Sequence, residues 1–134
     1  MLSVIISSCP PDQAQRIADA LLEQRVAACV SALSGVTSTY RWQGQLQRDP
    51  ETLLIIKTPT DQVSACMAAL QAVHPYSVPE MVVLAADRVS EAYLQWAIAE
   101  TRDQQPQLLD CPSAPTAPVA PANRESGARH AGRS

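Results

Sequence analysis

The amino-acid sequence predicts an α+β domain in which a four-stranded antiparallel sheet carries two helices on one face. Three observations lead to this prediction. Apolar residues alternate in some segments and recur at helical spacing in others, so strands and helices follow one another up to about residue 102. Two of the strands are joined by the turn Gln43-Gly44 without a helix between them. Finally, VIISSCPPDQ of residues 4–13 is similar to LLIIKTPTDQ of residues 53–62, as expected for two copies of one strand–helix unit.

The first strand and the first helix are predicted within residues 2–23. Residues 2–8 alternate and are rich in Val and Ile, and Pro10-Pro11-Asp12 then supplies a helix start. The apolar residues that follow recur at helical spacing: Ala14, Ile17, Ala18, Leu21 and Leu22. We therefore expect an amphipathic helix that packs on the sheet.

A long hairpin is predicted next. Residues 28–42 alternate again, and one parity is shared by Val30, Ala32, Val36, Tyr40 and Trp42. The returning strand runs to Thr58. Because proline cannot donate a hydrogen bond to a neighbouring strand, a bulge or an edge is expected at Asp49-Pro50.

The remaining segments predict a second helix, a fourth strand and a last helix. The second helix begins at Pro59-Thr60-Asp61 and ends at HPYSVPE, residues 74–80. Residues 81–86 then predict a buried strand, and Ser90 is expected to cap a C-terminal helix. The order β-α-β-β-α-β, with an extended hairpin between the second and third strands, is the ferredoxin-like arrangement.

The length of the hairpin predicts self-association. Fifteen residues from 28 to 42 span ~50 Å when fully extended, whereas a domain of 100 residues has a radius of gyration of only ~13 Å. A projecting hairpin leaves Tyr40, Trp42 and unpaired edge groups in water, so another subunit is expected to cover them. Alternatively, Gly35 allows a bend that folds the hairpin back.

A domain boundary is predicted near Arg102. Residues 103–134 contain five prolines among alanines and small polar residues and have no apolar period. Such a segment buries too little surface to offset its ordering entropy, so we expect a domain of residues 1–102 followed by a disordered Pro/Ala-rich tail. A docking segment for a partner is the alternative.

Composition excludes several classes of protein. The formal charge of −3 supplies no basic field for nucleic acid. The four cysteines lack CxxC spacing, and the apolar run at residues 2–6 is too short for a signal peptide or a membrane span, so we expect a soluble cytoplasmic protein with reduced thiols. No nucleophile motif, Gly-rich phosphate loop or close pair of catalytic carboxylates indicates an enzyme.

Two interpretations of His74 remain open. Its ring is a suitable ligand for Cu(II), but no HxxxH, HxH or CxxC pattern supplies a second ligand nearby. Alternatively, His74 ends the second helix, because Pro75 disfavours helical geometry at the residue before it. Lys57 and Glu80 likewise lie at strand ends, where they form either a mutual salt bridge or a site for an anion or small molecule.

Several separate motifs resemble the CutA divalent-ion tolerance family. These are AACVSALSGVTSTYRWQGQLQRDPETLLIIKT of residues 27–58, HPYSVPE of residues 74–80 and AYLQWAIAETR of residues 92–102. The resemblance implies a ferredoxin-like homotrimer whose hairpins clasp neighbouring subunits, as in the related PII signal proteins. It also implies a role in tolerance or response to copper and other divalent cations, with no obligatory cofactor and copper binding in some members.

The resemblance also implies candidate site residues. For a metal these are His74, Cys29 and Cys9, and for a pocket between subunits they are Lys57, Glu80, Tyr93, Trp42, Tyr40 and Tyr76. The chain departs from some members at Val73, where they place a second histidine, and at Ser8, where they place a thiol. The alternative function is that of a PII-like signalling trimer that binds a small ligand or an anion at the subunit interfaces.

Overall fold

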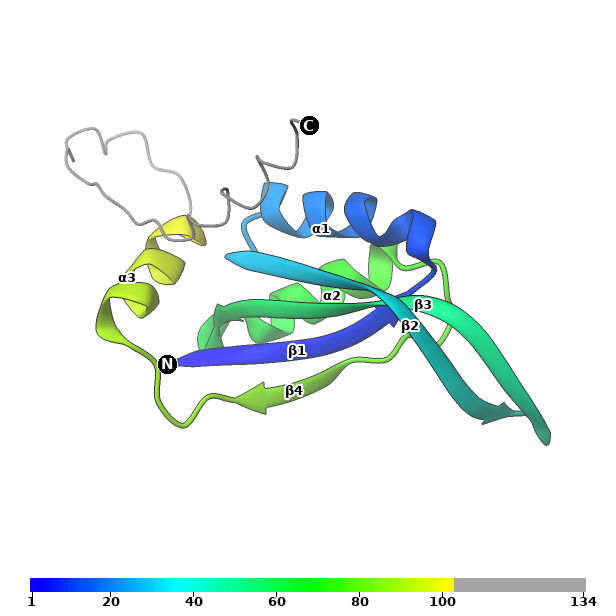
Figure 1. Ribbon diagram of the computed structural model, residues 1–134. Helices are drawn as coiled ribbons and strands as arrows, with labels where there is room; N and C mark the ends of the chain where they lie inside the picture. Colours follow the sequence, from blue (N-terminus) through cyan, green and yellow to red (C-terminus); the bar gives the residue numbers. More distant parts are fainter. Residues whose placement is uncertain (103–134) are drawn as a thin grey trace, which may run out of the picture. The chain divides into compact units, whose positions relative to one another are not determined.

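Four strands form one sheet in the order β2-β3-β1-β4, and every neighbouring pair runs antiparallel (Figure 1). The structure is a computed structural model that describes residues 1–102, and the predicted tail lies outside the described residues. The strands are β1 (Leu2–Cys9), β2 (Cys29–Trp42), β3 (Gln45–Pro59) and β4 (Val82–Ala85). The helices are α1 (Ala14–Glu23), α2 (Val63–Val73) and α3 (Glu91–Glu100). This confirms the predicted ferredoxin-like α+β fold.

The two similar sequence stretches adopt the same local structure. Each strand leads through a proline into a single 3-10 turn, η1 (Pro11–Gln13) before α1 and η2 (Thr60–Gln62) before α2. The prolines Pro10 and Pro59 have nearly equal dihedral angles, with φ of −60° and −58° and ψ of 142° and 146°. The sequence similarity therefore reports a repeated β–η–α unit.

One face of the sheet carries the core. Ile5 of β1 and Leu54 and Ile56 of β3 are fully buried against α1 and α2, where they meet Leu21 and Leu70. Burying one such side chain stabilises the fold by roughly 1.5–3 kcal/mol, so this layer fixes the positions of both helices on the sheet.

The other face of the sheet, which we call the open face, points away from this core. It is defined by residues that share a side in the strand register: Val4, Ile6, Ser8, Cys29, Ser31, Leu33, Leu53, Ile55, Lys57, Val82 and Leu84. Leu33 and Leu84 are 55% and 53% exposed. The chain therefore leaves an apolar sheet face in contact with water.

The fourth strand differs from its prediction. Residues 81–86 were expected to form a buried strand, but all four residues of β4 are exposed. The reason is position: β4 lies at the edge of the sheet and pairs only with β1 among the described strands. An apolar run alone does not distinguish a central strand from an edge strand that a partner covers.

The register of β2 shifts by one residue in mid-strand. Leu33 pairs with Leu53, but Val36 pairs with Glu51, so β2 contains one residue more than β3 in this interval. Gly35 lies inside the bulge and has φ +80°, a conformation that favours glycine. The bulge therefore occurs in β2, and of the two alternatives predicted at Asp49-Pro50, a bulge or an edge, the register shows the edge.

This bulge reverses which side chains face which side. Val30 and Ala32 lie on the helix-covered side, whereas Val36, Tyr40 and Trp42 lie on the side of the open face, as their pairing with β3 shows. These five residues therefore share one parity in the sequence but not one face of the sheet. An inserted residue changes the alternation of every side chain that follows it.

The hairpin projects beyond the rest of the sheet. Pairing of β1 with β3 ends at Cys9 and Thr52, so residues 36–51 pair only with each other (Figure 1). Pro50 lies in this segment, at the predicted edge. The turn places Gln43 and Gly44 at φ of 52° and 80°, as a two-residue hairpin turn requires.

Candidate functional site

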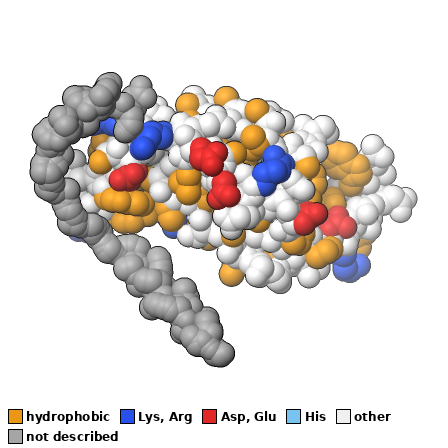
Figure 2. Space-filling model, turned by 90° about the horizontal axis from the view of Figure 1, so that it is seen from above, with side chains coloured by type: hydrophobic (Ala, Val, Ile, Leu, Met, Phe, Trp, Pro, Cys, Tyr) orange, Lys and Arg blue, Asp and Glu red, His pale blue; other side chains and the backbone are white. Residues whose placement is uncertain are grey.

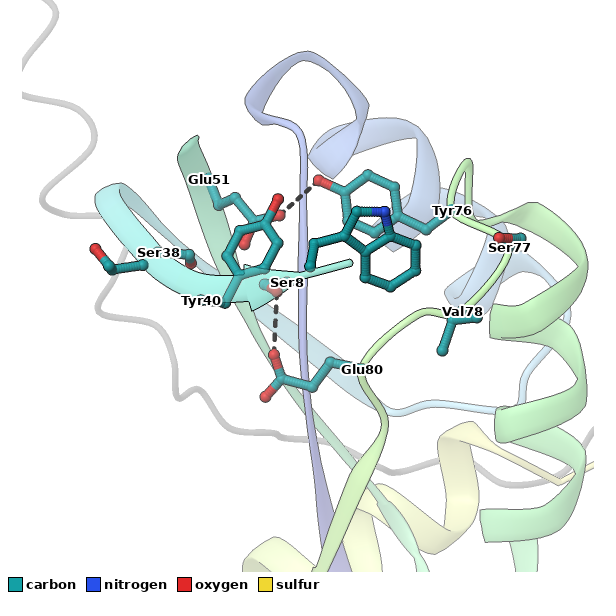
Figure 3. Close-up of a pocket in the computed structure, with 10 residues that line it drawn as sticks. Ser8, Ser38, Tyr40, Glu51, Tyr76, Ser77, Val78 and Glu80 are labelled. Carbon is teal, nitrogen blue, oxygen red and sulfur yellow. Dashed lines mark hydrogen bonds between the residues drawn. The ribbon is translucent and has the colours of Figure 1, made fainter. Parts of the chain in front are cut away.

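A hollow of about 590 Å³ opens between the hairpin, the end of β1 and the loop after α2 (Figure 3). We call it the hairpin hollow, and it is lined by Ser8, Ser38, Thr39, Tyr40, Trp42, Glu51, Tyr76, Ser77, Val78 and Glu80. Three segments contribute: the end of β1, the hairpin strands, and the loop between α2 and β4. Because the bulge turns Ser38, Tyr40 and Trp42 to the side of Ser8, these side chains converge.

His74 holds the loop against β1. It follows α2 directly in an extended conformation, with φ −76° and ψ 139°, as expected before Pro75. Its Nε2 atom lies 2.8 Å from the backbone oxygen of Ser8, and the Tyr76 N–H donates to its Nδ1 atom at 3.1 Å. Since Nδ1 accepts a hydrogen bond, the hydrogen-bond network assigns the ring proton to Nε2. Both nitrogens are engaged, which favours the interpretation of His74 as the residue that ends the helix.

Carboxylates line the hairpin hollow. Glu51 is only 6% exposed, and the Tyr76 hydroxyl donates to its Oε2 atom at 2.5 Å. Glu80 is exposed, and the Ser8 hydroxyl donates to its Oε1 atom at 3.1 Å (Figure 3). Burial and the bond to Glu51 raise the pKa of Tyr76 above its usual range, so its hydroxyl stays a donor at neutral pH.

A second polar group lies on the open face, and we call it the Lys57 cluster. The Lys57 ammonium donates to Ser31 Oγ at 2.9 Å and to Cys29 Sγ at 3.6 Å. Tyr93 of α3 lies beside Cys29, and burial together with this neighbour raises the pKa of Tyr93 to about 12. The cluster therefore joins β2, β3 and α3.

The predicted pocket residues thus divide between two places. Glu80, Trp42, Tyr40 and Tyr76 line the hairpin hollow, whereas Lys57 and Tyr93 belong to the Lys57 cluster. On β3, Lys57 lies four positions from Leu53, the partner of Ser8, which corresponds to ~13 Å. The predicted salt bridge between Lys57 and Glu80 is not formed within the chain, because the two residues lie at different ends of the open face.

The predicted metal ligands also lie apart. Cys9 is fully buried on the helix side of the sheet and pairs with Thr52, whereas Cys29 faces the open side and pairs with Lys57. Five positions along β3 correspond to ~17 Å. Within residues 1–102 no group of three or more His, Cys, Asp or Glu side chains is placed to hold a metal ion. The metal-binding roles of His74, Cys29 and Cys9 therefore stay predictions.

Sequence reasoning missed Glu51 as a residue of the site. The signal was present, because Glu51 shares the parity of Leu53 and Ile55 and is thus an acid next to apolar residues on one strand face. In the structure, the Glu51 side chain at this position is buried. Ser8 was considered only as a place where other proteins carry a thiol.

Charged side chains of both signs are distributed over one face of the molecule. Figure 2 shows basic and acidic side chains interspersed on the face viewed there, without a basic stripe among the described residues. Dispersed cations do not form the field that attracts phosphate backbones. Within the described part of the chain, no helix has the length and apolar character needed to cross a membrane.

The fold and the site define the class of this protein. It is a ferredoxin-like domain with a projecting hairpin and a hollow lined by carboxylates. The chain belongs to the CutA1 divalent ion tolerance protein family, whose family model matches residues 3–100. The divalent-cation tolerance protein CutA of Thermus thermophilus is 42% identical over 97 residues, which cover 72% of this chain and 94% of that protein. The CutA protein of Pectobacterium atrosepticum is 41% identical over 100 residues, covering 74% and 91%.

Solved structures of the family superpose on this chain. The crystal structure of CutA from Xylella fastidiosa has a TM-score of 0.73 at 38% identity and covers 75% of this chain and 98% of its own. The structure described as the periplasmic divalent cation tolerance protein CutA from Archaeoglobus fulgidus has a TM-score of 0.73 at 27% identity, covering 76% and 100%. The matched residues span the described domain and therefore include the hairpin and the residues that line the hollow.

Proposed function

We propose that this protein acts in divalent-cation tolerance by binding such cations as a cytoplasmic homotrimer. The observation that carries this proposal is the pair Glu51 and Glu80, which present two carboxylates to one hollow together with the hydroxyl of Ser8. Membership of the divalent ion tolerance family supports the choice of ligand. No catalytic constellation is part of the proposal, and the cation is bound rather than used in a reaction.

The donor set suits a divalent cation. Carboxylate and hydroxyl oxygens are ligands for hard cations, and Cu(II) also accepts oxygen donors. Two carboxylates from one chain are too few to enclose a cation, so water or a neighbouring subunit must complete its coordination. His74 contributes by positioning, because its bonds hold the backbone at Ser8 and Tyr76 on two sides of the hollow.

The exposed apolar surface supports an oligomer. The open face exposes Leu33, Val82 and Leu84, and the hairpin exposes Tyr40 and Trp42. Contiguous apolar surface of this kind marks an interaction site in a soluble protein. The number of subunits, three, comes from the resemblance to CutA proteins.

Calorimetric titration tests the cation site. Cu(II), Zn(II) and Mg(II) are titrated into the full-length protein in a Cys111→Ser/His130→Gln background, which removes soft ligands outside the described residues. Glu80→Gln and Glu51→Gln are expected to lower affinity for the bound cation at least tenfold, or about 1.4 kcal/mol. Glu23→Gln, an exposed acid of α1, is the matched control. Unchanged affinity in both hollow variants would place the cation elsewhere.

A PII-like small-ligand function is the second candidate. The hollow of about 590 Å³ is larger than a bare ion needs, and the rings of Tyr40, Trp42 and Tyr76 form part of its wall. Volumes of roughly 300–1,000 Å³ with aromatic walls are typical of small-molecule sites. A panel of nucleotides and metabolites in the same calorimetric assay decides between the two functions. Binding of one panel member to the wild type, together with loss of that binding in Trp42→Ala, would favour the small-ligand function.

A further inference from the structure

Lys57 is the single lysine of the chain, and its ammonium has only neutral partners in the described structure. The hydroxyl of Ser31 and the thiol of Cys29 accept its hydrogen bonds. Within residues 1–102 the one ion pair joins Arg25 to Glu100. The positive charge of Lys57 is therefore not balanced within the described domain.

The apolar surroundings of Lys57 restrict which kind of surface can cover its charge. Lys57 pairs with Val4, which pairs in turn with Leu84, and Ile55 lies on the same side of β3. A partner that covers these apolar side chains also takes the ammonium out of water. Such desolvation is unfavourable unless an opposite charge meets the ammonium. The covering surface must therefore supply a negative group.

The open side of the same chain supplies negative groups at its other end. Glu80 and Glu51 line the hairpin hollow, but the offset of ~13 Å along β3 keeps Lys57 from reaching them within one chain. In a ring of identical subunits, two different patches of neighbouring copies meet at each interface. The Lys57 end of one copy can then face the carboxylate end of the next.

We propose that Lys57 of one subunit pairs with Glu80 of the neighbouring subunit, so that a second copy of the chain completes the hairpin hollow. This inference rests on the homotrimer of the proposed function. Glu80 is the better partner because it is exposed. The Ser8 hydroxyl donates to its Oε1 atom, which leaves its Oε2 atom for the ammonium. Glu51 is buried and already accepts the bond from Tyr76.

The aromatic walls of the hollow fit this occupant. An ammonium is attracted to the faces of Tyr and Trp rings, and Tyr40, Trp42 and Tyr76 line the same hollow as the carboxylates. A divalent cation at Glu80 competes with the ammonium for the same carboxylate. Cation binding and subunit assembly are therefore coupled, and the coupling is reciprocal.

A charge-swap experiment on the full-length protein tests the pair. Molar mass is measured by light scattering along a dilution series for the wild type, Lys57→Glu, Glu80→Lys and the double variant. Each single variant is expected to raise the concentration of half-dissociation at least tenfold, and the double variant to return within about threefold of the wild type. Glu23→Lys on α1, outside the open face, is the control and keeps the wild-type value.

The outcomes separate this inference from the homotrimer itself. A wild type that is monomeric overturns both. A wild-type trimer with unaffected single variants overturns the pair and leaves the homotrimer standing. Single variants that dissociate without recovery in the double variant also overturn it, because Lys57 then meets an anion or another acid. If a reversed charge prevents folding, as far-ultraviolet circular dichroism reports, the cycle Lys57→Met and Glu80→Gln replaces it, and a coupling of zero overturns the pair.

Discussion

The imidazole Nε2 atom of His74 lies 2.8 Å from the backbone oxygen of Ser8, which ties the loop after α2 to the end of β1. Ser8 in turn donates from its hydroxyl to Glu80, further along the same loop. The two bonds connect one residue of the strand with both ends of the loop HPYSVPE. The frame of the hairpin hollow is therefore built from a helix terminus, and both ring nitrogens of His74 form hydrogen bonds that stabilise it.

Replacing His74 with alanine is expected to destabilise the domain. The change leaves the buried Ser8 carbonyl without its partner, which costs about 1–3 kcal/mol. Urea unfolding monitored by tryptophan fluorescence measures this loss. Copper affinity of the surviving protein is expected to stay within about threefold of the wild type, since neither nitrogen is free. A tenfold loss of affinity with an intact fold would instead show that His74 is a ligand.

Tyr93 is expected to make stability depend on alkaline pH. Burial and its contact with Cys29 raise its pKa to about 12 in the folded chain, from the usual 10.0. A raised folded pKa means that the stabilising contribution is complete below about pH 10 and is lost as pH rises through about 12. Melting temperatures between about pH 8 and 12 are therefore expected to fall more steeply for the wild type than for Tyr93→Phe. Parallel curves would contradict the contribution of this hydroxyl.

Most of the fold could be predicted because each element carries its own period. The apolar spacing of α1 and the β-branched run of β1 depend on local chemistry, and both occur where expected. The bulge of β2 could not be placed, since its one local signal is Gly35 and glycine has several uses in a strand. An unplaced bulge reverses the assignment of Tyr40 and Trp42 to a face.

The candidate site was harder to predict than the fold. The sequence grouped Lys57 with Glu80 because both lie at strand ends, but it contains no measure of distance across a sheet. Strand register places them at opposite ends of the open face. Glu51 was missed for a related reason, because its burial depends on the Tyr76 loop that folds over it.

A pair of leucines separates core stability from assembly. Leu54→Ala removes a fully buried side chain and is expected to lower the free energy of unfolding by about 2–5 kcal/mol, a third of a typical domain's stability. Leu33→Ala makes the same chemical change on the open face, where the side chain is 55% exposed in the single chain. It is expected to weaken the proposed homotrimer. Denaturant titration at two protein concentrations distinguishes the effects, and equal, concentration-independent losses would contradict the assignment of the open face to an interface.

Truncation after Arg102 is expected to leave the melting temperature nearly unchanged. The sequence of residues 103–134 has no periodic apolar face that could pack on the domain. Differential scanning calorimetry of the truncated and full-length proteins at equal concentration provides the comparison. A drop of more than about 5 °C, which in a domain of this size is roughly 1 kcal/mol, would show that the tail packs.

Gly35→Ala tests the part that the bulge plays in shaping the hollow. The residue has φ +80°, which an L side chain adopts at a cost of about 1–3 kcal/mol, and no atom lies within 4 Å of the position that an added methyl group would take. The cost is therefore one of backbone conformation and not of crowding. We expect a modest loss of stability together with weaker cation binding, because relaxing the bulge moves Tyr40 and Trp42 away from the side of Ser8.

Gly44→Ala is the matched control for this change. It also replaces a glycine at φ +80° with open space around it, but it lies in the hairpin turn and not in the bulge, and it does not itself line the hollow. We expect both variants to lower the free energy of unfolding, measured in urea, by similar amounts. Only Gly35→Ala is expected to lower the cation affinity measured by calorimetry. Equal affinities in the two variants would show that the hollow keeps its shape without the bulge.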